Sequence, residues 1–400
     1  MKHTGGVIYH GGYYRAARVL RLVRYAVLSL LLLFTLVIFL TFRQDMTLNH
    51  FRYLLNNFDF SPNASSTSGD TIYYDGDAEA SFGFVSGGLV TLTDTRVFVT
   101  DRSSSTTLSA YHGYRQPMGA YSDRYMVIYD RKGSTATVYN AFSLLKTYTY
   151  DGTMTMASAA DNGNFATVVA DVDRYYTKVF VYGGDLSLLV TVSKYKYVTA
   201  IDFTPDGESL LIVSRYTDGG KMKSELVLLD VAKKEARFTL TLDGAIYSAS
   251  AEEDYCLLLG EIGVTGYDYE GRAVSSASFS ETPHKSALLS EGVITAVSGA
   301  DSRRETLSYY TNEGVYTLLL PSRLVLARED ADFVYLLLES GICLFDKQTK
   351  AFTDVSSSVS LEGAVTLLSD GSRVYLAYTH RADRLDGKAL VLKKIENTAR

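Results

Sequence analysis

The chain has 400 residues, of which 46% are hydrophobic and 21% are charged, and its formal net charge at pH 7 is −6. These values are ordinary for globular proteins, so the composition excludes a disordered chain and allows a sizeable buried core. The part up to Arg43 has six basic and no acidic residues, whereas the rest has 33 basic and 45 acidic residues, a net charge of −12. Because nucleic acids are polyanions, a domain this acidic is not expected to bind them non-specifically.

The first predicted element is a transmembrane helix at residues 25–42, YAVLSLLLLFTLVIFLTF, which has no charged residue. A helix rises about 1.5 Å per residue, so this run can just cross a bilayer core of about 30 Å. Basic residues precede the run at a spacing of three, and only Arg43 follows it closely. The preceding residues are Arg15, Arg18, Arg21 and Arg24. This asymmetry predicts that residues 1–24 form a cytoplasmic tail. The arginines either orient the anchor only or also form a stripe on anionic lipid.

A cleaved signal peptide is the alternative for this apolar run. The run is longer than the usual 7–15 residues or so, and Arg43-Gln44-Asp45 follows it in place of a cleavage site of the A-x-A type. No cysteine follows the run either, which argues against lipoprotein processing. We therefore predict an uncleaved, single-pass anchor in the cell membrane, with the C-terminal domain outside the cytoplasm.

Residues 43–70 are predicted to connect the anchor to the rest of the chain. Within residues 46–60, apolar side chains recur at spacings of three, four and three, which places them on one face of a helix. These side chains are Leu48, Phe51, Leu55 and Phe58. The helix can lie on the membrane surface or pack on the following domain, the more usual place for an amphipathic helix. Residues 61–70, SPNASSTSGD, are typical of a flexible linker.

One motif then recurs eight times: small or apolar residues, a short polar turn and an apolar run. Its clearest copy is IDFTPDGESLLIV, residues 201–213, where Pro-Asp-Gly favours a turn between two strands. We expect the second strand of this hairpin, Leu210–Val213, to be buried on both faces. The gaps between successive copies range from 36 to 47 residues. The second turn residues of the copies are Gly87, Asp123, Asn162, Asp206, Glu253, Glu291, Ala331 and Asp370.

Each copy is followed by two further strand-like segments, for example residues 224–232 and 235–242 after the hairpin at 201–213. Four short strands per period of about forty residues are typical of a β-propeller blade. Small residues at 156–160, MASAA, suit the crowded axis of such a ring. A β-solenoid is the alternative, but its coils are shorter. The predicted fold is all-β: a single β-propeller of eight four-stranded blades, or seven, at residues 71–396, preceded by one transmembrane helix.

The FTPDG segment, residues 203–207, is similar to the FSPDG hairpin of TolB-like and YVTN-like propellers, a WD-repeat-like superfamily. The Asn-, Asp- and Gly-rich turns of the other copies look like degenerate forms of it. The architecture also resembles an uncharacterised bacterial family of single-pass membrane proteins with propeller ectodomains. These resemblances imply the fold and no specific function. The chain has no Trp, so it lacks both the Trp-Asp pair of WD repeats and the tryptophan docking motifs of quinoprotein propellers.

The ends of the ring are expected to join through residues 71–75, TIYYD. The last copy supplies only three strand-like segments, residues 363–368, 372–379 and 388–395. An open blade would leave an unpaired edge, which invites aggregation. We therefore predict that residues 71–75 pair beside residues 388–395.

Both cysteines, Cys256 and Cys343, lie in apolar runs of non-neighbouring repeats and are expected to be free, buried thiols.

The sequence shows no catalytic, cofactor-binding or metal-binding motif. No G-x-S-x-G nucleophile elbow and no phosphate loop occur, and GEIGVTG at residues 260–266 is read as a turn. No pair of histidines has metal-ligand spacing. DGDAE at 75–79 and DNGN at 161–164 do not complete a calcium loop. We therefore predict no catalytic residue, no cofactor and no metal.

Two hypotheses for function follow. The first is a membrane-anchored, extracytoplasmic interaction module that binds a protein or a cell-envelope polymer, because propellers hold rigid loops around a channel. The alternative is a small-ligand-binding or hydrolytic site at the channel mouth. Carboxylates near the blade turns, such as Asp123, Asp202 and Asp206, would then have to converge.

Overall fold

The computed structural model describes residues 11–41, 71–75, 80–172, 174–298, 304–311 and 313–398. The chain divides into two compact units, residues 1–60 and 61–400, and each is described by itself. The amphipathic helix predicted at 46–60 and the linker predicted at 61–70 lie outside the described residues.

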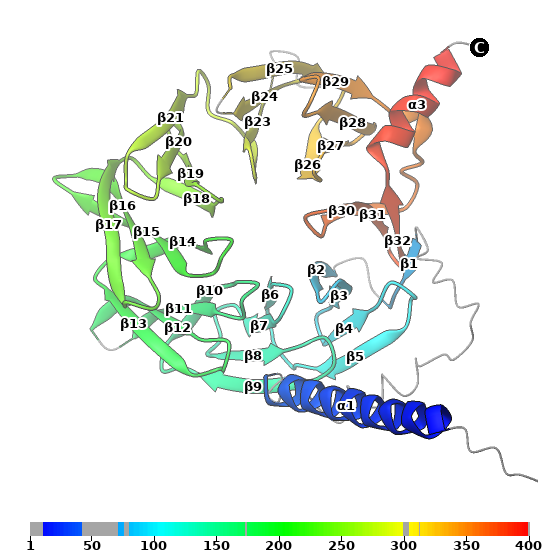
Figure 1. Cartoon of the computed structure of the whole chain (residues 1–400). Coiled ribbons are helices and arrows are strands. Elements are labelled where there is room, and N and C mark those ends of the chain that lie inside the picture. Colours follow the sequence, from blue (N-terminus) through cyan, green and yellow to red (C-terminus); the bar gives the residue numbers. More distant parts are fainter. Residues whose placement is uncertain are drawn as a thin grey trace, which may run out of the picture. The chain divides into compact units, whose positions relative to one another are not determined.

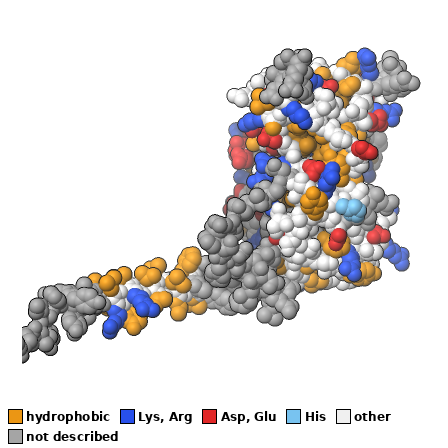
Figure 2. Space-filling view, turned by 90° about the vertical axis from the view of Figure 1, so that its right-hand side faces the viewer, with side chains coloured by type: hydrophobic (Ala, Val, Ile, Leu, Met, Phe, Trp, Pro, Cys, Tyr) orange, Lys and Arg blue, Asp and Glu red, His pale blue; other side chains and the backbone are white. Residues whose placement is uncertain are grey.

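The described part of the first unit is helix α1 (Gly11–Thr41). It starts before the predicted element at 25–42 and includes the arginine-rich segment. From Val19 to Phe34 every side chain of α1 is exposed, and Figure 2 shows this surface as mainly hydrophobic with a few basic groups. Within the described ranges, no helix combines the length and the hydropathy that a membrane crossing requires.

The second unit is a β-propeller of eight blades, which confirms the predicted fold with eight blades rather than seven (Figure 1). Each blade is a four-stranded antiparallel sheet, and in blades 1 to 7 the strands follow the order of the chain. The strands of blades 1 to 4 are β2 (Ser81–Val85), β3 (Gly88–Leu92), β4 (Arg96–Thr100), β5 (Thr106–Tyr111); β6 (Pro117–Tyr121), β7 (Met126–Asp130), β8 (Thr135–Tyr139), β9 (Leu144–Thr149); β10 (Thr153–Ala159), β11 (Phe165–Val172), β12 (Tyr175–Tyr182), β13 (Leu188–Lys194); β14 (Tyr197–Phe203), β15 (Ser209–Asp218), β16 (Lys221–Asp230) and β17 (Glu235–Asp243).

The strands of blades 5 to 8 are β18 (Ile246–Ala251), β19 (Tyr255–Gly260), β20 (Gly263–Asp268), β21 (Ala273–Ser278); β22 (Lys285–Leu289), β23 (Gly292–Ser298), β24 (Glu305–Thr311), β25 (Val315–Leu320); β26 (Leu324–Glu329), β27 (Phe333–Leu338), β28 (Gly341–Asp346), β29 (Ala351–Asp354); β30 (Ala364–Ser369), β31 (Val374–Tyr378), β32 (Arg381–Leu385) and β1 (Thr71–Tyr73). A short 3-10 helix, Ser356–Ser358, follows β29. The first strand of each blade lies innermost in the ring (Figure 1).

The second strands pack between neighbouring blades, which is why their sequences are continuously apolar. In blade 4, the four side chains Leu210–Val213 are all 0% exposed, as predicted. Leu210 and Ile212 contact the cluster shared with blade 3, and Leu211 and Val213 contact the cluster shared with blade 5. Each blade therefore buries both faces only on its neighbours, which makes the ring cooperative. Cys256 and Cys343 are free and buried, as predicted.

Residues 71–75 close the ring, but with a different partner from the predicted one. β1 pairs antiparallel with β32, with Ile72 opposite Ala382, and not with residues 388–395. Those residues belong to helix α3 (Gly387–Thr398), so the strand predicted there is wrong. Asp386 begins the helix, because its carboxylate accepts a hydrogen bond from the amide of Ala389 at 3.2 Å and thus caps the N-terminus.

Candidate functional site

The turn between the first and second strand of each blade lies at one face of the ring. The eight blades share one topology, so these turns surround the same end of the central channel, which we call the inner-turn face. The turns are 86–87, 122–125, 160–164, 204–208, 252–254, 290–291, 330–332 and 370–373. Their acidic residues are Asp123, Asp161, Asp206, Glu208, Glu252, Glu253, Asp254, Glu291, Asp330, Asp332 and Asp370, whereas their basic residues are Arg124 and Arg373. The eight inner turns are therefore mainly acidic.

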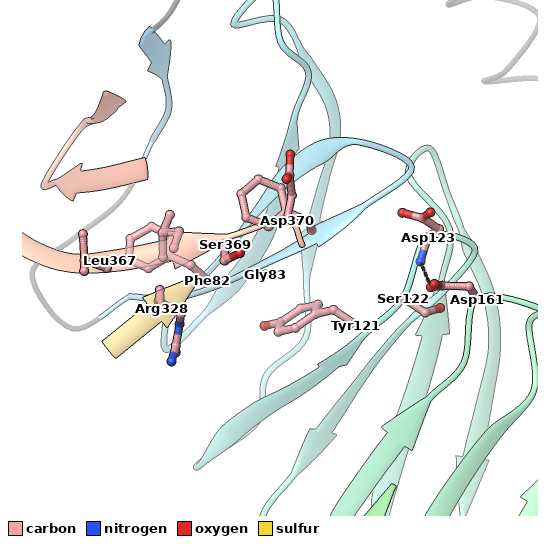
Figure 3. Close-up of a pocket in the computed structure, with 12 residues that line it drawn as sticks. Phe82, Gly83, Tyr121, Ser122, Asp123, Asp161, Arg328, Leu367, Ser369 and Asp370 are labelled. Carbon is pink, nitrogen blue, oxygen red and sulfur yellow. Dashed lines mark hydrogen bonds between the residues drawn. The ribbon is translucent and has the colours of Figure 1, made fainter. Parts of the chain in front are cut away.

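Two cavities adjoin at the channel mouth on this face. The first has a volume of about 360 Å³ and lies mainly between blades 8, 1 and 2 (Figure 3). Its lining includes Phe82, Tyr121, Asp123, Asp161, Arg328 and Asp370. The second, of about 420 Å³, lies between blades 6, 7 and 8, and its lining includes Glu291, Arg328, Glu329, Lys347 and Ser369. Arg328 and Ser369 line both cavities, so the two volumes meet beside blades 7 and 8.

Three carboxylates border the first cavity. The Asp161 carboxylate accepts a hydrogen bond of 2.8 Å from the amide of Asp123, drawn in Figure 3. The Asp370 carboxylate accepts hydrogen bonds from the amides of its own turn, and it lies 3.8 Å from the guanidinium of Arg102. Partial burial, and then the charges of Asp161 and Asp370, raise the pKa of Asp123. The negative charge at this cavity is therefore incompletely compensated.

The second cavity contains a basic group that is well paired. Lys347 lies 2.6 Å from the Glu329 carboxylate and 3.7 Å from that of Glu291. Nearby in blade 5, burial raises the pKa of Glu252 to about 7, and the charges of Glu329 and Asp202 add to this effect. Near neutral pH, Glu252 therefore titrates, and the negative charge of the mouth changes with pH.

Arg328 differs from Lys347 because no carboxylate among the described residues pairs with it. Its guanidinium donates a hydrogen bond of 3.0 Å to the carbonyl oxygen of Ala327, its neighbour on β26. Burial lowers the pKa of Arg328, and no ion pair with a described carboxylate offsets that cost. Within the described residues, the channel mouth thus has a positive group without a carboxylate partner on blade 7 and incompletely compensated carboxylates on blades 2 and 3.

The three aspartates proposed from the sequence do not converge. Asp123 lines the first cavity, whereas Asp202 and Asp206 line neither of the two cavities. The Asp202 carboxylate accepts hydrogen bonds from the amides of Ala251 and Phe203, and burial raises its pKa to about 6. Asp206 accepts hydrogen bonds within its own turn. Asp202 and Asp206 therefore support the blades and do not join Asp123 in the lining of the first cavity.

The basic residues of the mouth, Arg328 and Lys347, are absent from the sequence-based candidates. One signal for Arg328 exists in the sequence: the first strands of other blades end in small or apolar residues, such as MASAA in blade 3, whereas blade 7 has LARED.

The DNGN segment at 161–164 forms a turn, as predicted. Among the described residues, no group of three His, Cys, Asp or Glu side chains is arranged to hold a metal ion.

Comparisons with known proteins concern the fold more than the site. Residues 67–317 match the sequence model of a family described only as a family of unknown function, DUF5711. A search of curated proteins finds no match.

Solved structures similar to this chain are propellers of low sequence identity. Sqt1 from Saccharomyces cerevisiae is 13% identical, with 79% of this chain and 98% of Sqt1 covered and a TM-score of 0.56. Sqt1 from Chaetomium thermophilum, bound to the N-terminus of the ribosomal protein L10, is 12% identical, with coverages of 79% and 99% and a TM-score of 0.54. BamB from Moraxella catarrhalis is 14% identical, with coverages of 78% and 97% and a TM-score of 0.51. At these identities, the similarity establishes the fold alone.

Proposed function

The chain belongs to the family of unknown function DUF5711, and we propose that it is a membrane-anchored interaction module whose inner-turn face binds a basic segment of a partner protein. The observation that carries the proposal is the group of carboxylates around the first cavity: Asp123, Asp161 and Asp370. Partial burial, and then the charges of Asp161 and Asp370, raise the pKa of Asp123, and a lysine or arginine side chain would offset the repulsion between these carboxylates. A propeller of the same fold, Sqt1, is known bound to the N-terminus of another protein, which supports a protein segment as the ligand.

The binding proposal is tested by the affinity of the full-length protein for a fluorescent lysine-rich peptide. The triple variant Asp123→Asn, Asp161→Asn and Asp370→Asn removes the charge and keeps side chains of similar shape. Exposed ion pairs contribute roughly 0.2–1 kcal/mol each, so we expect binding to weaken about tenfold.

The matched control is the triple variant Asp151→Asn, Glu261→Gln and Glu339→Gln. These three exposed carboxylates lie between strands at the opposite face, so the change in net charge is the same. Equal weakening by both triple variants would show a non-specific charge effect and contradict the proposal.

The membrane part of the proposal rests on the uncharged run at residues 25–42 and the arginines before it. We propose that the N-terminus is cytoplasmic and the propeller extracytoplasmic. In cells that carry Thr4→Cys or Thr217→Cys, a membrane-impermeant maleimide should label only the second variant. The native cysteines are buried and should react little. Labelling of position 4 in intact cells would overturn the orientation.

A second candidate, a small-ligand-binding site at the same mouth, is favoured by the volume of the first cavity. Its 360 Å³ falls in the range of about 300–1,000 Å³ that is typical of ligand pockets.

A further inference from the structure

Two groups of opposite charge face the same cavity without neutralising each other. Arg328 reaches the first cavity from β26 of blade 7, and Asp123 reaches it from the inner turn of blade 2. Figure 3 shows Arg328 on one side of the cavity and Asp123 with Asp161 on the other. The ring, closed through β1 and β32, holds these sides apart, since they belong to blades that are not neighbours.

Neither charge is satisfied by the surrounding described residues. Arg328 donates to the carbonyl oxygen of Ala327 and forms no ion pair. No described group donates a hydrogen bond to the Asp123 carboxylate, and the other carboxylates at this cavity, Asp161 and Asp370, repel it. A desolvated charge without a partner costs free energy, and a ligand that supplies the partner recovers that cost on binding.

Tyr121 is an aromatic part of the cavity wall and is closely packed. Tyr121 lies over two glycines: a Cβ atom on Gly83 would be 2.2 Å from its ring, and one on Gly119 would be 2.2 Å from its hydroxyl oxygen. Side chains at these two positions would therefore displace the Tyr121 ring from the cavity wall. The lining also includes the apolar side chains Phe82, Phe84, Leu367 and Leu368 and the polar side chains Ser122 and Ser369. Apolar and aromatic side chains beside a few placed polar and charged groups are common in ligand pockets.

We infer that the first cavity binds a ligand with a carboxylate and a cationic group at separate positions: the carboxylate on Arg328 and the cation on Asp123 and Asp161. The guanidinium suits the first contact because its fork of N–H donors matches a carboxylate. An amino acid, or the C-terminal residue of a peptide with a basic side chain, has this chemistry. The inference rests on the proposed function and deepens it, because it specifies the end of the basic segment that enters the channel.

The test is a calorimetric titration of the full-length protein with three probes: Ac-Ala-Ala-Lys with a free C-terminal carboxylate, the same peptide as its C-terminal amide, and L-lysine. We expect the free carboxylate to bind about tenfold tighter than the amide, because a charge-assisted hydrogen bond is lost in the amide. Arg328→Gln should abolish this preference and Arg328→Lys should keep part of it. The exposed Arg131 gives the control variant Arg131→Gln, which should behave as the parent.

L-lysine distinguishes the two sources of the ligand. Binding as tight as that of the peptide supports a free amino acid, and weaker binding supports a peptide terminus. Equal affinity of the parent protein for carboxylate and amide overturns the inference. If, in that case, the triple aspartate variant still binds the lysine-rich peptide more weakly than the parent protein, only the inference about Arg328 is wrong and the proposed function remains supported. If none of the three probes binds and the triple variant binds the lysine-rich peptide as the parent does, both the inference and the proposed function are wrong.

Discussion

The inner turns of blades 4 and 2 are built from the same kinds of residue but use their aspartates differently. In blade 4, Asp206 accepts hydrogen bonds from the Thr204 hydroxyl at 2.6 Å and the Glu208 amide at 2.9 Å, and Gly207 adopts a φ of +69°. In blade 2, the amide of Asp123 is bonded to Asp161, but its carboxylate faces the first cavity. An aspartate in a repeated turn therefore has a structural role where its carboxylate oxygens accept local hydrogen bonds, and its charge can act on a ligand where they do not.

Disrupting the closure of the ring at β1 should have the largest effect on stability and on peptide binding. β1 pairs with β32 in blade 8 and leads into blade 1, and both blades line the first cavity. Ile72 is 2% exposed on β1, whereas Tyr73 is 62% exposed. Ile72→Asp should lower the free energy of unfolding by about 4 kcal/mol, since it buries a charge and removes core packing, and it should abolish peptide binding. Tyr73→Asp is the control and should change little. Chemical denaturation checks both, and equal stability of the two variants would mean that the ring closes elsewhere.

The pH dependence of stability should sharpen the contrast between buried and exposed carboxylates. Burial raises the pKa of Glu252 from 4.5 to about 7 and that of Asp202 from 3.8 to about 6. Between pH 4.5 and 7 the folded protein therefore holds protons that the unfolded chain has released, so its stability falls as the pH rises through this window. We expect a loss on the order of 2 kcal/mol for each group. Glu252→Gln should raise stability at pH 8 and leave it unchanged at pH 4, and an effect independent of pH would be inconsistent with this assignment.

Matched substitutions should distinguish the roles of Asp206 and Asp123 in their turns. Asp206→Ala should lower the free energy of unfolding by about 1–2 kcal/mol, because two local hydrogen bonds to its carboxylate are lost. Asp123→Ala should leave stability unchanged or slightly higher, because it removes a repelled charge. Binding of the lysine-rich peptide should be weakened by Asp123→Ala and changed little by Asp206→Ala. Thermal denaturation and the peptide titration give both readouts, and a parallel response of the two variants would remove the distinction.

Arg328→Gln should have the smallest effect on stability. The substitution removes a partly buried charge that no described carboxylate pairs with, so we expect a gain of about 0–1 kcal/mol rather than a loss. Thermal denaturation next to Arg131→Gln measures it. A loss of several kcal/mol would show that Arg328 is a structural residue.

Local repeats made most of the fold predictable, because each blade is specified by a turn and an apolar second strand within about forty residues. Residues 388–395, KALVLKKI, are compatible with a strand or a helix, and the capping residue Asp386 is the signal that distinguishes the helix. The site was less predictable. Asp123 is one of many acidic turn residues, and the cavity that it lines together with Arg328 arises from ring closure between blades that are distant in the sequence. No local pattern contains that information.

The most direct test of binding at the inner-turn face is to locate the bound segment. A lysine-rich peptide with a photoreactive group is cross-linked to the full-length protein, and the modified residues are identified by mass spectrometry. If the first cavity binds the basic segment, we expect cross-links to residues of its lining, Phe82, Tyr121 and Asp123, and we expect these cross-links to be lost in the triple aspartate variant. Cross-links concentrated at the opposite face, around Asp151 and Glu261, would contradict it.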